Sequence, residues 1–137
     1  KVVKTNGKGR YLSRGSDVSL IGMSYTSVVC QEAAKRLSEE GISAEVVDML
    51  SLSPFDEEII LETVMKTNRA VIVDEDTPRA SMASEFAAII ADRAFDYLDA
   101  PVKRVTSPHT PVPYNRDLEM SFMPGVDDVI ATVKSLV

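Results

Sequence analysis

Short apolar segments alternate with amphipathic stretches along most of the chain. The apolar segments cover residues 17–23, 44–50, 70–73 and 102–105, and a more polar one at Arg10–Ser13 reads as an edge strand. The first four have the length of β-strands and almost no polar alternation, which is typical of strands buried on both faces.

The stretches between these segments carry apolar residues at the spacing of one helical face. The predicted stripes are Cys30, Ala33, Ala34 and Leu37; Ile60, Leu61, Val64 and Met65; Met82, Phe86, Ile89 and Ile90; and Val126, Val129, Ile130 and Val133. The third stripe belongs to a long helix predicted over residues 81–97. Gly41 and Asn68 stand where the first two helices should end, because both residue types tolerate the left-handed backbone conformation.

This alternation of strand and helix predicts an α/β fold with a mostly parallel sheet covered on both faces. The crossover connections should be right-handed. Residues 1–16, rich in glycine and basic side chains, read as a linker with an edge strand, and residues 17–137 as the domain itself.

Residues 106–124 do not fit the alternation. The segment has 19 residues with four prolines and neither a helical nor a strand period, and loops of this length usually bind something or are disordered. It nevertheless carries Tyr114, Leu118, Met120, Phe122 and Met123. A disordered tail would not favour such residues, so we expect an extended path along a surface, either the domain's own or a partner's. Tyr114, Leu118, Phe122 and Met123 should be under-buried in the isolated domain and mark an interface.

Composition narrows the classes of function. The 137 residues include 15 basic and 21 acidic side chains, a formal charge of −6, with one cysteine and one histidine. This balance argues against a nucleic-acid binder, and the single cysteine and histidine exclude an internal disulfide and a multi-histidine metal site. With no apolar run long enough for a membrane span and an unpaired thiol, we expect a reducing compartment, the cytoplasm or the mitochondrial matrix.

The sequence offers few reactive side chains. His109 lies in the proline-rich segment and titrates near neutrality in its ordinary state, so it is a candidate at a site or interface, although a loop histidine bonded to backbone is the simpler interpretation. Cys30 falls on an apolar helical stripe without basic neighbours, which indicates a buried, inert thiol.

Asp74, Glu75 and Asp76 follow the most apolar strand and should emerge at the carboxyl edge of the sheet, where open α/β folds place ligands. They could form an interface, or cap the next helix and contact Arg79. Adjacent residues of a strand point to alternate sides, so binding of one metal by all three is disfavoured.

Three further carboxylates, Asp99, Asp127 and Asp128, are candidates for an acidic docking surface, with ordinary solvation of helix ends as the alternative. No glycine-rich phosphate cradle follows the first buried strand, where Gly22 stands alone before a hydroxyl-rich stretch at residues 24–27. That stretch could hold an anion only weakly.

Longer motifs resemble a known family. The segment from DVSLIGM to AVIVDE, residues 17–75, resembles the start of the C-terminal domain of transketolase-type, thiamine-diphosphate-dependent enzymes. The stretches VDED at 73–76, AFDYLDAPVKRVT at 94–106 and PHTPVPY at 108–114 resemble the beta subunit of the decarboxylating component of 2-oxo acid dehydrogenases. The resemblance runs from about Gly15 to the C-terminus.

The resemblance implies a three-layer αβα sandwich with a five-stranded, mostly parallel sheet. It implies a parent enzyme that decarboxylates a 2-oxo acid on thiamine diphosphate and magnesium and transfers the acyl group to lipoyl. The expected partners are a preceding pyrimidine-binding domain, an alpha subunit, a second beta subunit and the basic subunit-binding domain of the core acyltransferase. Neither nucleic acid nor a membrane is expected as a partner.

This sequence differs from the family pattern in two ways that bear on its expected role. Residues 76–84, DTPRASMAS, hold no glycine where many family members have a glycine-rich stretch, and the residues that activate the cofactor belong to the pyrimidine-binding domain, which this sequence lacks. We therefore expect an assembly domain that binds no cofactor and carries no catalytic residue. The alternatives are the C-terminal domain of another transketolase-type enzyme or a free-standing α/β ligand-binding or regulatory module.

Overall fold

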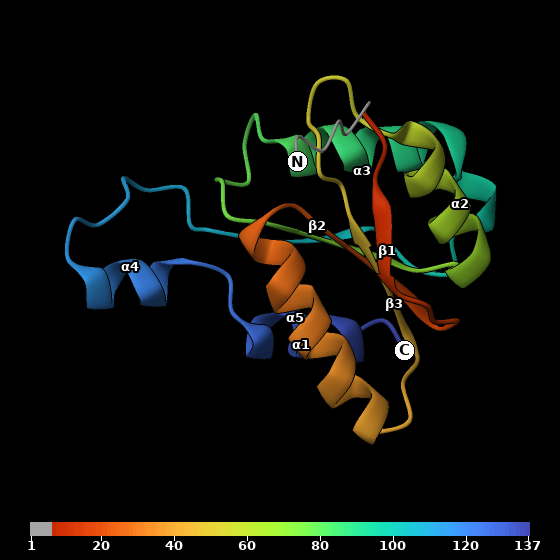
Figure 1. Ribbon diagram of the computed structural model, residues 1–137, viewed down its shortest axis with the longest axis horizontal. Helices are drawn as coiled ribbons and strands as arrows, with labels where there is room; N and C mark the ends of the chain where they lie inside the picture. Colours follow the sequence, from red (N-terminus) through yellow and green to blue (C-terminus); the bar gives the residue numbers. More distant parts are fainter. Residues whose placement is uncertain (1–6) are drawn as a thin grey trace, which may run out of the picture.

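The computed structural model describes residues 7–137 and shows one five-stranded sheet (Figure 1). The strands are β1 (Arg10–Ser13), β2 (Val18–Gly22), β3 (Ala44–Asp48), β4 (Ala70–Asp74) and β5 (Lys103–Thr106). Their order in the sheet is β1-β3-β2-β4-β5, and only β1 runs antiparallel to its neighbour. The mostly parallel sheet predicted from the sequence is confirmed, while residues 1–6 of the expected linker lie outside the described residues.

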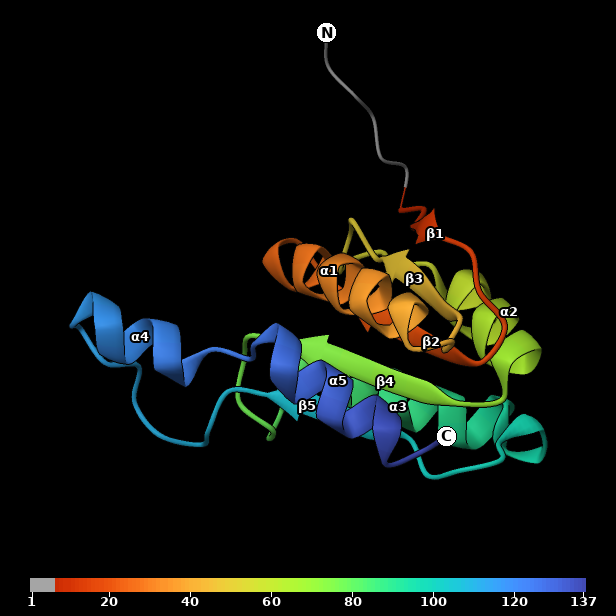
Figure 2. The ribbon, with the colours of Figure 1, turned by 90° about the horizontal axis from the view of Figure 1, so that it is seen from below.

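Helices cover both faces of this sheet (Figure 2). They are α1 (Tyr25–Glu39), α2 (Glu57–Thr67), α3 (Met82–Arg93), a 3-10 turn η1 (Phe95–Tyr97), α4 (Arg116–Phe122) and α5 (Val126–Lys134). One apolar cluster joins the sheet to α1 and α5, and a second joins its other face to α2 and α3. The three-layer αβα arrangement is therefore confirmed.

Each central strand contributes to both clusters. Leu20 and Val73 face α1 and α5, whereas Ile21 and Ile72 face α2 and α3, and all four are fully buried. Burial on both sides explains why these strands read as continuous apolar runs rather than as alternating ones.

Two sequence predictions were wrong, one on the end of a helix and one on a segment expected to hold no helix. The helix predicted over residues 81–97 ends at Arg93. The side-chain amide of Asn68 donates to the carbonyl of Tyr97, and the backbone carbonyl of Asn68 accepts from the amide of Asp99, so the chain leaves the helix axis here. Within the segment expected to lack a period, Asn115 caps a short helix, α4, by accepting from the amides of Asp117 and Leu118. A helix of only two turns is too short to leave a periodic pattern in the sequence.

A buried carboxylate ties the edge of the sheet to its centre. The side chain of Glu45 on β3 is fully buried and accepts hydrogen bonds from Thr63 at 2.8 Å, Lys66 at 2.7 Å and the amide of Gly15 at 3.3 Å, with Arg14 at 3.2 Å. Burial alone would raise the pKa of Glu45, but these hydrogen bonds and the Arg14 charge hold the pKa below its usual value. Glu45 thus fastens the chain after β1 onto the domain.

Replacing Glu45 with Gln should lower the free energy of unfolding at neutral pH by roughly 1–3 kcal/mol, since the two ion pairs are lost while Lys66 and Arg14 can still hydrate. Because folding lowers the pKa of Glu45, its contribution is complete above the unfolded-state pKa of about 4.3 and is lost as the pH falls through the folded-state value. Urea unfolding at a series of pH values should show the two proteins converging over that acidic interval.

The matched control is Glu58→Gln, which removes a carboxylate that is largely exposed and that, within residues 7–137, forms an ion pair with the surface residue Lys8 alone. Its unfolding midpoint should stay at the parent value. An equal loss of stability in both variants would mean that the buried network around Glu45 has no special role.

Candidate functional site

The carboxyl ends of the four parallel strands lie at one edge of the sheet, and this edge is the candidate site. The connection after β2 leads to β3 and the connection after β4 leads to β5, on the opposite side, so β2 and β4 flank the point where the winding reverses. In open α/β sheets the crevice at such a point is the usual ligand position. Here it begins with Met23 and Ser24 after β2 and with Asp74 at the end of β4.

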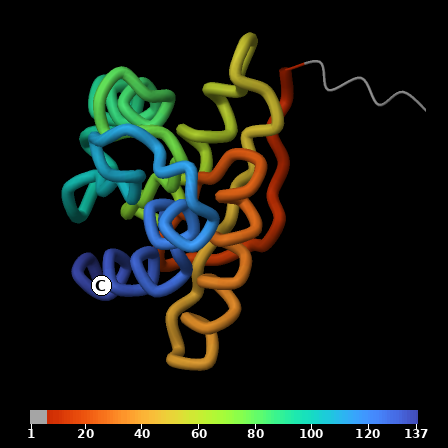
Figure 3. The backbone as a smooth tube through the Cα atoms, turned by 90° about the vertical axis from the view of Figure 1, so that its left-hand side faces the viewer, coloured from red at the N-terminus to blue at the C-terminus, as the bar shows by residue number. Residues whose placement is uncertain are grey.

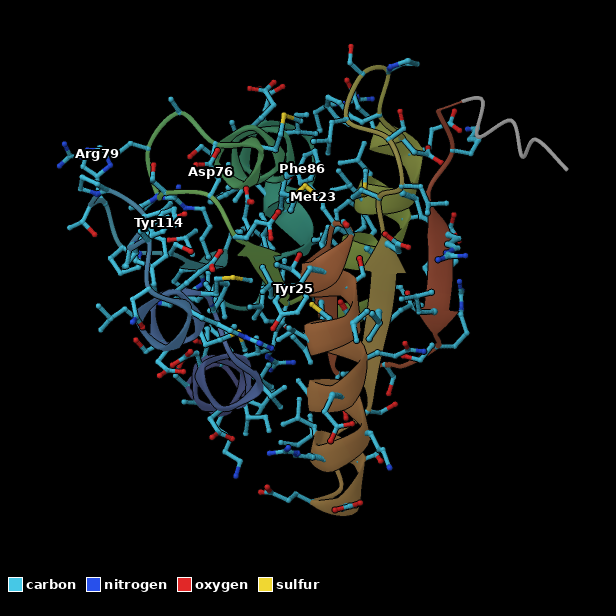
Figure 4. The ribbon with its side chains drawn as sticks, turned by 60° about the vertical axis from the view of Figure 1, so that its left-hand side comes forward. Met23, Tyr25, Asp76, Arg79, Phe86 and Tyr114 are labelled. Atoms are coloured by element: carbon cyan, nitrogen blue, oxygen red, sulfur yellow. The ribbon has the colours of Figure 1, made fainter. Side chains whose placement is uncertain are left out.

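Two hollows at this edge form one cleft. The first, about 560 Å³, includes Met23, Met82, Met123 and Phe122 together with the acidic residues 74–76 and Glu119. The second, about 710 Å³, includes Tyr25, Val28, Leu50 and Arg10. Both hollows share Met23, Ser24 and Leu52. We call the two together the carboxyl-edge cleft; Figure 4 shows Tyr25 at the first turn of α1.

The three adjacent carboxylates do not act as one group. Asp74 is buried, and its two oxygens accept from the amides of Asp76 and Ala83, both at 3.1 Å, so it caps the start of α3. Asp76 accepts from the amide of Thr77 at 2.7 Å, and Glu75 is exposed. Figure 4 shows Arg79 pointing outward, away from Asp76. The capping alternative therefore holds for Asp74, without the contact to Arg79.

The other two reactive residues predicted from the sequence, His109 and Cys30, do not form a common site either. His109 is exposed, and within residues 7–137 its ring makes no hydrogen bond. Cys30 is fully buried among apolar side chains of α1, and burial raises the pKa of its thiol to about 12. Across the described residues no group of three His, Cys, Asp or Glu side chains could hold a metal ion.

Residues 108–123 form an arm that projects beyond the ends of the strands (Figures 1 and 2). In Figure 3 the arm lies nearest the viewer, with α1 and α3 on either side of it. Tyr114 is fully exposed and Leu118 is 58% exposed, whereas Phe122 and Met123 are half-buried against the cleft. None of the four apolar residues singled out from the sequence is buried. A seven-residue helix without a buried side chain gains little from its own packing.

The remaining acidic candidates lie in other places. Asp128 accepts from the amide of Gly125 and so caps α5, and Asp127 pairs with Arg36 at 3.3 Å. Asp99 lies at the opposite, amino edge of the sheet, just before β5, where its amide donates to Asn68. The sequence candidates thus divide between two ends of the domain instead of forming one surface.

Four exposed apolar residues of the cleft were missed from the sequence. They are Tyr25, Val28, Leu50 and Leu52, which are 41–62% exposed. Two signals were available: Val28 falls off the apolar stripe of its helix, and two leucines interrupt the serine- and proline-rich turn at residues 50–54.

The backbone at this edge is also constrained. Ser24, Leu50 and Ala80 each lie in a strand-to-helix connection of the sheet and have positive φ angles of 53°, 52° and 54°. Such conformations are costly for residues other than glycine and gather at functional surfaces. The three positive-φ residues and the exposed apolar side chains therefore occur at the same edge of the sheet.

Comparison with known proteins gives a consistent result. The family model for the C-terminal domain of transketolase matches residues 7–129. The chain is 46% identical over 130 residues to the acetoin:2,6-dichlorophenolindophenol oxidoreductase subunit beta of Bacillus subtilis, covering 95% of this chain and 38% of that one. It is 37% identical over 128 residues to the mitochondrial pyruvate dehydrogenase E1 component subunit beta of Dictyostelium discoideum, covering 93% and 36%.

A solved structure described as a split gene transketolase, inactive beta4 tetramer, superposes with a TM-score of 0.83 at 28% identity, covering 98% of this chain and 43% of that one. Transketolase from Campylobacter jejuni shares the fold, with a TM-score of 0.62 at 16% identity over 97% of this chain and 19% of that one. The chain thus spans well under half the length of these relatives. Among the described residues, no helix combines the length and apolar character needed to cross a membrane.

Replacing Asp74 with Ala should lower the free energy of unfolding by about 1–2 kcal/mol, because the amide of Ala83 at the start of α3 and the amide of Asp76 in the turn after β4 lose their acceptor. Asp76→Ala, which removes one bond in an exposed turn, should cost less than half as much. Thermal unfolding of both variants measures the difference. An Asp74→Ala variant as stable as the parent protein would show that capping by Asp74 does not stabilise the fold.

Proposed function

This chain belongs to the transketolase C-terminal domain family and corresponds to the C-terminal part of an E1 beta subunit, and from that premise we propose that it is an assembly domain of a thiamine-dependent 2-oxo acid dehydrogenase. The parent enzyme would decarboxylate a 2-oxo acid and pass the acyl group to lipoyl. In this proposal the domain joins subunits and supplies no catalytic group.

The main support is the contrast between the two kinds of side chain at the carboxyl edge. Asp74 is used for capping, and His109 stands alone in solvent. The apolar residues, by contrast, are exposed around a cleft, as at surfaces that pack against other chains. The edge is therefore suited to packing rather than to proton transfer.

The cofactor does not suit this edge. Thiamine diphosphate presents a doubly charged diphosphate, which needs a metal ion, basic side chains or a cradle of free backbone amides. The hollow at the β2–β4 crevice instead carries Glu75, Asp76 and Glu119, whose charges would repel an anion. These residues support a parent enzyme in which thiamine diphosphate and magnesium are held by other domains.

The amino edge is the better place for a basic docking partner. Asp99 is exposed, and within residues 7–137 its carboxylate makes neither a hydrogen bond nor an ion pair. Asp92 and Asp96 on the adjoining α3–η1 segment are also exposed. Asp127 and Asp128, in contrast, are already engaged at the start of α5. Of the acidic candidates, Asp99 therefore suits docking of the basic subunit-binding domain of the core acyltransferase, where charge complementarity speeds association.

Replacing Asp99 with Asn should weaken binding of that basic domain to the assembled enzyme by roughly threefold to tenfold, mainly through the association rate and more at low salt. Surface plasmon resonance at two ionic strengths measures this effect. Asp127→Asn is the control and should bind like the parent protein. If Asp99→Asn and Asp127→Asn bind the basic domain with equal affinity, the amino edge is not its docking surface.

A further inference from the structure

Asn68 occupies the turn between α2 and β4, at the amino edge of the sheet. It ends α2 in the left-handed conformation, with φ 63° and ψ 6°, and its backbone amide donates to the carbonyl of Val64 at 2.8 Å. Beside it, the hydroxyl oxygen of Thr67 lies 2.6 Å from that of Ser19 on β2. The turn is therefore fixed both to its own helix and to a central strand.

Asn68 binds the two peptide groups on either side of Leu98. Its side-chain amide donates to the carbonyl of Tyr97 at 2.7 Å, and its backbone carbonyl accepts from the amide of Asp99 at 2.9 Å. Leu98 is extended and packs against the apolar cluster of α2 and α3. Since successive side chains of an extended segment point to opposite sides, Asp99 points outward, in agreement with its exposure.

The end of the first helix shows that the backbone conformation alone does not require asparagine. Just past the end of α1, Gly41 has a φ of 85°, which glycine adopts without steric cost. A side chain at Gly41 would meet no other described atom within 4 Å. Glycine at position 68 would satisfy the same left-handed turn. What asparagine adds there is the donor to the carbonyl of Tyr97.

We propose that Asn68 is a positioning residue for docking at the amino edge: by holding residues 97–99, it directs the carboxylate of Asp99 toward a basic partner. The inference rests on the proposed docking of a basic domain at Asp99. Within residues 7–137 this carboxylate has no hydrogen bond or ion pair of its own, so its direction depends on the backbone that carries it. A surface that is already ordered in its binding geometry loses less entropy on association.

Positioning and charge have different kinetic effects on docking. The charge of Asp99 acts over a distance, which is why its loss should slow association. The direction of the carboxylate matters only once the two proteins are in contact, so a loss of positioning should appear in the dissociation rate. Variants of Asn68 and of Asp99 can therefore be told apart by their rates.

Surface plasmon resonance of the assembled enzyme with the isolated basic subunit-binding domain measures both rates. Asn68→Gly keeps the left-handed turn and removes the donor, and Asn68→Asp keeps the size of the side chain and replaces the donor with an acceptor. Both should dissociate on the order of threefold faster, as expected for the loss of one hydrogen bond of modest strength, and Asn68→Gly should associate at the parent rate. The control is Ser38→Ala, which removes a hydroxyl that donates to the carbonyl of Lys35 on α1 and should leave both rates unchanged.

A double variant, Asn68→Gly with Asp99→Asn, separates positioning from a general effect on the fold. It should dissociate no faster than Asp99→Asn alone, because the carboxylate that Asn68 positions is gone. Parent dissociation rates for both Asn68 variants would overturn the inference, and so would an equal acceleration with and without the Asp99 carboxylate. If Asp99→Asn itself binds like the parent protein, the proposed docking site fails, and this inference fails with it. That outcome is seen in the Asp99 variant alone, so the two failures are distinguishable.

Discussion

Burial of the sheet on both faces is the constraint on which the rest of the structure depends. Helices α1 and α5 cover one face and α2 and α3 the other, so the fully buried central strands β2, β3 and β4 offer no surface for recognition. Among the described residues, the two ends of the sheet and the segments that connect strands to helices hold the candidate surfaces. The carboxyl edge holds the cleft and the arm, and the amino edge holds Asp99.

The same constraint explains where the polar side chains are used. A carboxylate close to a covered sheet must be hydrogen-bonded, and Asp74, Asp48 and Glu45 each accept from amides, hydroxyls or basic groups. These groups stabilise turns and join the edge strand to the centre. Their commitment to structure is consistent with a domain whose parent enzyme holds its reactive groups elsewhere.

Much of the fold could be predicted from the sequence, since buried strands and amphipathic helices leave strong local patterns. The parts that could not be predicted depend on contacts between distant residues. Asn68 ends α3 from another helix, which no pattern near Arg93 indicates. The candidate site was predicted only in part, because the exposure of Leu50 and Leu52 depends on the path of β1 and the arm. Even so, the exposed positions of Tyr114 and Leu118 agree with an expectation drawn from sequence alone.

The central claim is that this domain joins subunits while other domains hold the cofactor. Isothermal titration calorimetry of the 137-residue domain with thiamine diphosphate and Mg²⁺ tests it most directly. The domain should give no binding heat, because its carboxyl edge carries acidic side chains and no cradle for a diphosphate. Saturable binding at micromolar concentrations, lost in a variant of the carboxyl-edge cleft, would contradict an assembly role and would place part of the cofactor site in this domain.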